Sequence, residues 1–158
     1  MENDDRLFLI SQTYATLFSV TNKLQAAGDE SMRELTTRQL MALIAIAHIP
    51  EEEVTLNAIA SKLGATKQST AQIINNLKNK EYLTSEKSKS DARAVNIIIT
   101  EKGKKVFEEA NKQGWMFLQN TFKAFSEEEL TQLWTLLKKL YQFDGEDQDG
   151  FEADGRKL

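Results

Sequence analysis

A short polar segment between two runs of strand-forming residues most constrains how this chain can fold. The runs are residues 82–87 and 94–99, and the connection between them reads Ser88-Lys89-Ser90-Asp91-Ala92-Arg93. Two such runs joined by a polar connection predict a β-hairpin. Thr100-Glu101-Lys102-Gly103 then predicts a capped helix start directly after the second strand. An arginine at the tip of a rigid hairpin is badly placed for packing and well placed to enter a groove.

Two short helices are predicted just before this hairpin. Thr55 and Thr66 can each cap a helix, and Gly64 can end the first one. The inner faces of the two helices would carry Ile59, Ala60 and Leu63 in the first, and Thr70, Ile73, Ile74 and Leu77 in the second. Two helices joined by a short turn and followed by a hairpin predict a winged helix-turn-helix, which presents one helix and one hairpin to DNA.

Longer helices are predicted on both sides of this module. Residues 6–26 carry apolar side chains at helical spacing, and we expect Gly28 and Asp29 to close that helix. The capping pair Thr36 and Gln39 begins a second helix, which is apolar nearly all round and should be buried. That helix is expected to end before Pro50.

After the hairpin, we expect one helix over residues 101–124 and a last one beginning at the capping box of Ser126 and Glu129. Twelve of the thirteen aromatic residues lie outside residues 30–105, so the terminal helices carry most of the bulky apolar surface. Pairing with a second copy of the chain would bury that surface. A monomeric helical core is the alternative.

Charge is distributed unevenly along the chain. The net charge at pH 7 is −4, which by itself argues against a nucleic-acid partner. Residues 55–104, however, hold nine Lys or Arg and four acidic residues, a net charge of +5. Residues 144–158 hold six acidic residues against two basic ones, and this composition predicts a disordered acidic tail. A positive segment within an acidic chain is typical of a phosphate-binding module.

Several classes of function are disfavoured by what the sequence lacks. With no cysteine and one histidine, we expect no disulfide, no metal site and no cofactor. No nucleophile triad and no phosphate-binding glycine loop supports an enzyme. No apolar run approaches the ~20 residues of a membrane helix, and the acidic start differs from a signal peptide, so we expect a cytoplasmic protein that does not bind membranes.

The order of helix, helix, helix-turn-helix, wing, long helix and last helix is similar to that of the MarR family of bacterial transcription regulators. The resemblance runs from Leu7 to Tyr141. Its sharpest motifs are Leu35-Thr36-x-x-Gln39, Ile59-Ala60-x-x-Leu63-Gly64, Asp91-x-Arg93 and Ile99-Thr100-Glu101-Lys102-Gly103. Two positions depart from the family pattern. Ala92 stands where the family usually has arginine, and Glu81 where it usually has glycine before the first wing strand.

The resemblance implies a mainly α fold with a small β-hairpin, in which dimerisation helices flank a winged helix-turn-helix. We therefore expect four parts. They are an N-terminal dimerisation helix (1–33), a DNA-binding lobe (34–100), C-terminal dimerisation helices (101–143) and the acidic tail (144–158).

The second short helix carries one set of candidate DNA-binding residues. If its apolar positions face the core, helical geometry leaves Lys67, Gln68, Ser69, Gln72 and Asn76 facing outward. Amide side chains can pair with adenine edges, and Lys67 can reach guanine or phosphate. The resemblance implies that this helix enters the major groove. The alternative is an ordinary solvated polar face.

The hairpin carries the second set. Arg93 is expected to enter the minor groove with its guanidinium oriented by Asp91, while Lys87 and Lys89 meet backbone phosphates. The alternative is a surface ion pair worth ~0–1 kcal/mol. The function expected is that of a sequence-specific regulator of transcription, most simply a repressor, that binds a palindromic operator in double-stranded DNA as a homodimer. The competing reading is a winged-helix module for protein–protein interaction that binds no operator.

Many regulators of this family release DNA when a small, often aromatic anion binds between the dimerisation helices and the DNA-binding lobe. Candidates to line such an effector pocket here are Tyr14, Phe18, Arg38, His48 and Trp115. Each of the five also fits an ordinary core or surface role.

Overall fold

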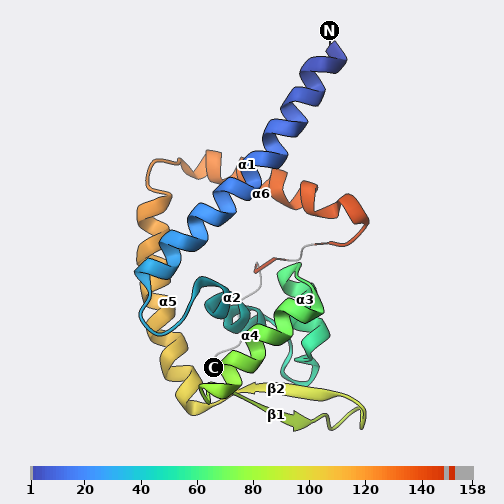
Figure 1. The fold of residues 1–158 in the computed structure, drawn as a ribbon, viewed down its shortest axis with the longest axis vertical. Helices are drawn as coiled ribbons and strands as arrows, with labels where there is room; N and C mark the ends of the chain where they lie inside the picture. The colour runs from blue at the N-terminus through green and yellow to red at the C-terminus, as the bar shows by residue number, and fades with distance from the viewer. Residues whose placement is uncertain (1, 148–149, 152–158) are drawn as a thin grey trace.

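The computed structural model describes residues 2–147 and 150–151, which form a mainly helical fold with one two-stranded antiparallel sheet (Figure 1). The predicted fold class is confirmed. The elements are α1 (Glu2–Ser31), α2 (Thr37–His48), the 3-10 helix η1 (Glu51–Glu53), α3 (Leu56–Leu63), α4 (Lys67–Asn79), β1 (Leu83–Lys87), β2 (Val95–Ile99), α5 (Glu101–Thr121), α6 (Glu127–Tyr141) and the 3-10 helix η2 (Gln142–Asp144).

Two parts of the molecule can be distinguished in Figure 1. The lobe consists of α2, α3, α4 and the hairpin of β1 and β2, which we call the wing. The frame consists of α1, α5 and α6. The N-terminal half of α1 projects away from the rest of the molecule (Figure 1). No helix in the described residues is long and apolar enough to cross a bilayer.

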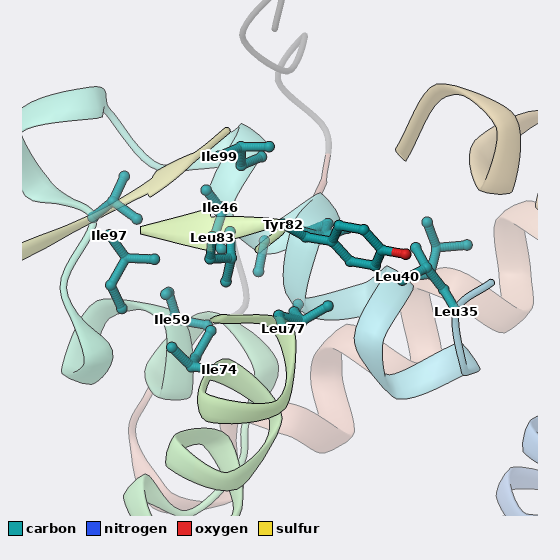
Figure 2. Close-up of a cluster of buried hydrophobic side chains, with 14 of the residues drawn as sticks. Leu35, Leu40, Ile46, Ile59, Ile74, Leu77, Tyr82, Leu83, Ile97 and Ile99 are labelled. Atoms are coloured by element: carbon teal, nitrogen blue, oxygen red, sulfur yellow. The ribbon is translucent and has the colours of Figure 1, made fainter. Parts of the chain in front are cut away.

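The hydrophobic core lies in the lobe, around α2. Leu43, Ile46, Ile59 and Leu77 are almost wholly removed from solvent, and Figure 2 shows aliphatic side chains from α2, α3, α4 and the wing converging on one cluster. Because α2 is apolar nearly all round, it can serve as the central element on which the other elements pack. The prediction that this helix is buried is confirmed.

The predicted helix starts are confirmed by their hydrogen bonds. Thr36 and Gln39 form a reciprocal capping box at α2, and Ser126 and Glu129 form another at α6. Thr55, Thr66 and Thr100 accept from the backbone N–H three residues on, at the starts of α3, α4 and α5. Gly64 ends α3 in the left-handed conformation, with φ +60°. Each signal is local, which is why it can be read from sequence.

The predicted end of the first helix is wrong. Instead of stopping at Gly28 and Asp29, α1 continues through both residues to Ser31. An added Cβ at Gly28 would collide with Thr37 Oγ1, and Asp29 Oδ1 accepts a hydrogen bond from the Thr37 backbone N at 2.6 Å. The glycine and the aspartate therefore join α1 to the start of α2 rather than ending a helix. At the other end of the chain, α5 is shorter than predicted and ends at Thr121.

The wing is joined to α5 by a tight junction. In its register Leu83 is opposite Ile99 and Lys87 is opposite Val95. Thr100 donates from its backbone N to Tyr82 O (3.0 Å) and from its hydroxyl to Glu81 O (2.7 Å). Glu81 itself has φ +64°, in the left-handed region that favours glycine. The departure at Glu81 noted in the sequence is thus a real conformational conflict.

Candidate nucleic-acid interface

The outward face of α4 is polar and free of acidic residues. Lys67, Gln68, Gln72 and Asn76 are exposed, while Thr70, Ile74 and Leu77 are buried against the rest of the lobe. Ser69 differs from the other predicted residues because it is half-buried and its backbone N–H and hydroxyl are both bonded to Thr66. Ser69 therefore supports the start of the helix, and the other four residues are the ones free to reach a base edge.

The tip of the wing is held by its own hydrogen bonds. Ser88 Oγ accepts from the backbone N of Ser90 and of Asp91, both at 3.3 Å, and Ser88 N donates to Ala94 O at 3.0 Å. Asp91 Oδ1 accepts from the backbone N of Arg93 at 2.9 Å. Arg93 is exposed at this tip.

The structure corrects the role that we expected for Asp91. Its carboxylate bonds the backbone of Arg93 in an Asx-type turn rather than orienting the guanidinium. Asp91 and Arg93 lie in the turn, outside both strands, so they do not share a strand face. Asp91 shapes the turn that presents Arg93, and the guanidinium stays available to a ligand.

One surface cavity brings the two predicted DNA-binding elements together. It has a volume of about 350 Å³ and is lined by Thr55, Leu56, Asn57, Lys67, Asp91, Arg93, Ala94 and Val95. Lys67 begins α4, Arg93 comes from the wing, and Asn57 lies in the first turn of α3. Two cations, the Asp91 carboxylate and a helix N-terminus thus share one face, and the remaining net charge of +1 together with the helix N-terminus favours phosphate. Sequence reasoning missed Asn57, because only the packing of the lobe shows that α3 begins beside the wing.

Lys87 and Lys89 lie in a different environment. They line a second cavity of about 220 Å³ together with Glu51, Glu52, Glu86, Ser90, Asn96 and Ile98. The carboxylates come partly from η1, which is held against the wing by the bond from Ile97 N to Val54 O at 2.8 Å. These acids reduce the local positive potential. The sequence shows the acidic run after Pro50 but not its position beside the wing.

The five predicted effector-pocket residues do not come together within one chain. Tyr14 and Phe18 pack on each other on the exposed side of α1, with ring centres 5.0 Å apart, and Trp115 is exposed on α5. His48 lies at the far end of α2, where its ring meets Phe151 edge to face at 5.3 Å.

Arg38 alone of the five lines a cavity in the expected place. This cavity of about 540 Å³ lies between α1, α2 and the turn joining α3 to α4, and its other lining residues are Thr21, Leu24, Gln25, Thr37, Met41, Leu63, Gly64, Ala65, Ser69 and Ile73. Arg38 Nε donates to Gln25 Oε1 at 3.2 Å. The cavity lies further along α1 than the predicted positions Tyr14 and Phe18. Its α1 residues are Thr21, Leu24 and Gln25, which follow Phe18 by about one to two helical turns.

Within residues 2–147 and 150–151, no three His, Asp or Glu side chains gather closely enough to hold a metal ion.

Comparison with known proteins agrees with this architecture. A model of the MarR family matches residues 34–94. The S. aureus MepR–DNA complex is similar to this chain at 25% identity and a TM-score of 0.71, covering 82% of this chain and 96% of that one. No curated protein sequence matches at a significant level.

Two further solved structures share the fold. A MarR/EmrR family transcriptional regulator from Acinetobacter sp. ADP1 has 21% identity and a TM-score of 0.76, covering 85% of this chain and 95% of that one. BpsR of Bordetella bronchiseptica, whose DNA binding is regulated by 6-hydroxynicotinic acid, has 20% identity and a TM-score of 0.70. The match covers 82% of this chain and 98% of that one.

Proposed function

We propose that this chain is a DNA-binding transcription regulator of the MarR family. In this proposal it recognises a two-part operator as a homodimer and releases it on binding a small ligand; the family model over residues 34–94 and the likeness to the MepR–DNA complex support it. The observation that carries sequence-specific binding is the shared face of Lys67 and Arg93. Gln68, Gln72 and Asn76, on the outward face of α4, read base edges in the major groove while Arg93 enters the neighbouring minor groove. Lys87 and Lys89 contact phosphates at the edge of the footprint.

Arg93 is the sharpest test of this proposal. We expect Arg93→Ala to cost ~1–3 kcal/mol of operator affinity and to leave the free energy of unfolding unchanged, because the side chain is exposed. The measurement is binding of the purified protein to its own upstream DNA across a salt series, where the log–log slope is roughly −0.9 per phosphate contact. Arg33→Ala, which removes an exposed arginine outside the lobe's cavity, is the matched control.

A folded Arg93→Ala protein that binds DNA as tightly as wild type would remove the wing from the proposal. Salt-independent or absent DNA binding by the wild type would favour the competing function, a protein-interaction module.

Homodimerisation is supported by the apolar surface of the frame. Large hydrophobic side chains stand exposed along all three of its helices, among them Leu7, Phe8, Tyr14 and Phe18 on α1, Trp115 and Met116 on α5, and Trp134, Leu136, Leu137 and Leu140 on α6. Large exposed apolar side chains in this number are typical of an interface. In a two-fold dimer, two copies of α4 would meet half-sites ~10 bp apart, which implies a palindromic operator.

Regulation by a ligand is supported by the cavity that Arg38 lines. Its volume lies in the range of small-molecule sites, and its lining combines Leu24, Met41 and Ile73 with one cation. We propose that a small anion with an apolar or aromatic body binds there. The structurally similar BpsR has its DNA binding regulated by a molecule of that kind, 6-hydroxynicotinic acid. In this proposal Tyr14, Phe18 and Trp115 contact the partner chain instead, and His48 packs at the end of α2.

Repression is the simplest outcome of such binding, because a dimer that covers promoter DNA excludes RNA polymerase by occupancy alone. A reporter gene driven by the chain's own upstream region tests whether the protein represses or activates transcription. Deleting the regulator should raise expression, and a fall in expression would identify an activator.

A further inference from the structure

The acidic residues after α6 have no role in the function proposed above. Here the chain passes through η2, turns at Gly145 with φ +87° and comes back towards the lobe (Figure 1). Only residues 144–147 and 150–151 of the predicted acidic tail lie within the described part of the chain. We call residues 141–147 the strap.

The strap is attached to the turn of the helix-turn-helix. The Tyr141 hydroxyl donates to Ser61 O in the last turn of α3 at 3.4 Å. The same ring covers Gly64, where an added Cβ would lie 3.0 Å from the hydroxyl and 3.1 Å from the ring edge. Tyr141 thus connects the end of the frame to Gly64, the first residue of the turn between α3 and α4.

A second aromatic contact lies beyond the strap. The Phe151 ring meets the His48 ring at the end of α2, and Lys62 Nζ on α3 lies 5.5 Å from its centre. The chain therefore approaches α3 both through Tyr141 and through Phe151. These two contacts lie on either side of Asp144, Glu146 and Asp147, which are themselves exposed.

The strap carries three carboxylates to the turn between α3 and α4. Asp144, Glu146 and Asp147 line a cavity of about 360 Å³ together with Ala60, Ser61, Gly64, Ala65, Tyr141 and Phe143. Internal bonds fix their arrangement, since Gln142 Nε2 donates to Asp147 Oδ1 at 2.6 Å and Glu146 N donates to Asp144 Oδ1 at 3.1 Å.

These carboxylates lie beside the turn that leads into α4. Ala65, which lines the same cavity, is two residues before Lys67, the first residue of α4. Three negative charges beside this turn oppose the approach of phosphate to the start of α4. The repulsion is strongest at low salt, where screening is weakest.

We propose that the strap is an intramolecular electrostatic brake on DNA binding, docked on the helix-turn-helix turn by Tyr141. It opposes the phosphate contacts that DNA of any sequence offers, so its effect is read most directly on random-sequence DNA, where base contacts add nothing. The brake rests on the DNA-binding function proposed above, and its effect is to lower the affinity for DNA of any sequence.

The first experiment neutralises the strap. We expect the triple variant Asp144→Asn, Glu146→Gln, Asp147→Asn to bind random-sequence DNA about fivefold more tightly at low salt, with the gain fading as salt rises. The control is Glu108→Gln, Glu127→Gln, Glu128→Gln, which makes the same change in net charge on exposed residues of α5 and α6. Equal effects of the two triples, or no effect of the strap triple, would overturn the brake.

Wild type and Arg93→Ala are measured beside these variants, which separates the two proposals. Suppose that wild type binds DNA, that Arg93→Ala weakens this binding, and that the strap triple binds like its control triple. The brake then fails while the proposed function stands. If wild type binds no DNA at all, the proposed function fails and the brake with it.

The second experiment tests docking itself. The chain has no cysteine, so a Ser61→Cys, Asp147→Cys pair can be joined by a short bismaleimide without competing thiols. We expect efficient intramolecular cross-linking, and much less for Thr135→Cys with Asp147→Cys. Adding Tyr141→Leu to the Ser61→Cys, Asp147→Cys protein should reduce cross-linking. In a separate protein without the cysteines, Tyr141→Leu should tighten binding to random-sequence DNA. Cross-linking that does not depend on Tyr141 would overturn its role as the anchor.

Discussion

Glu81 shows how one residue can hold a conformation that its side chain opposes. A left-handed conformation costs a residue with a Cβ about 1–2 kcal/mol. Two bonds impose it here, from Glu81 N to Lys78 O (2.9 Å) and from the Thr100 hydroxyl to Glu81 O (2.7 Å). The Glu81–Lys102 ion pair at 3.4 Å offsets little of this cost, because both side chains are exposed.

We therefore predict that Glu81→Gly stabilises the protein. Relief of the left-handed strain outweighs the ~0.4–1 kcal/mol that glycine costs through the unfolded chain, leaving a net gain of up to ~1 kcal/mol. Urea unfolding followed by circular dichroism measures it. Glu86→Gly, in the middle of β1, should instead destabilise. A loss of stability in Glu81→Gly would mean that the ion pair with Lys102 matters more than the backbone.

At the scale of elements, the junction between the wing and α5 depends on a glycine with no room beside it. An added Cβ at Gly103 would collide with the backbone oxygen of Tyr82 and lie 2.9 Å from Ile99 Cγ2. That oxygen also accepts from Thr100 N, so it cannot move without breaking the junction.

Gly103→Ala is accordingly expected to destabilise the protein by about 2 kcal/mol, within the usual range for overpacking and larger than the gain in helix propensity. Thermal unfolding is the measurement. Gly114→Ala in the same helix is the control, because its Cβ would meet only the end of the Leu40 side chain, at 3.2 Å. Equal effects of the two substitutions would contradict a special role for the junction.

The elements also show what can be predicted from sequence here and what cannot. Helix caps such as Thr36 with Gln39 depend on residues within one turn, and they were all predicted. The end of α1 depends on the contact of Gly28 with Thr37, and the environment of Lys87 depends on acids from η1. Residue type alone predicts an effector pocket drawn from several helices, but of its five candidates only Arg38 lines the cavity beside α1 and α2. Errors thus arise where distant segments meet.

At the scale of the whole molecule, the proposed dimer predicts the behaviour of α6. Leu137 is exposed in one chain, so Leu137→Asp should leave the fold of the lobe intact and should reduce the mass in solution to that of a single chain. Light scattering at micromolar concentration measures the mass. Gln132→Asp, on the opposite side of the helix, should leave the mass unchanged. A wild-type protein with the mass of one chain would refute the dimer.

The tip of α1 has a consequence for kinetics. Leu7, Phe8, Leu9 and Ile10 are between 47% and 65% exposed, and four consecutive helical residues point over about 300° of arc. No flat surface can cover side chains that point in nearly every direction, so burying them requires a partner that encloses the helix. Chains interlocked in this way must withdraw one helix from the other before they part. Once assembled, two such chains would exchange subunits slowly, and a chain made before a change of conditions would keep its original partner long afterwards.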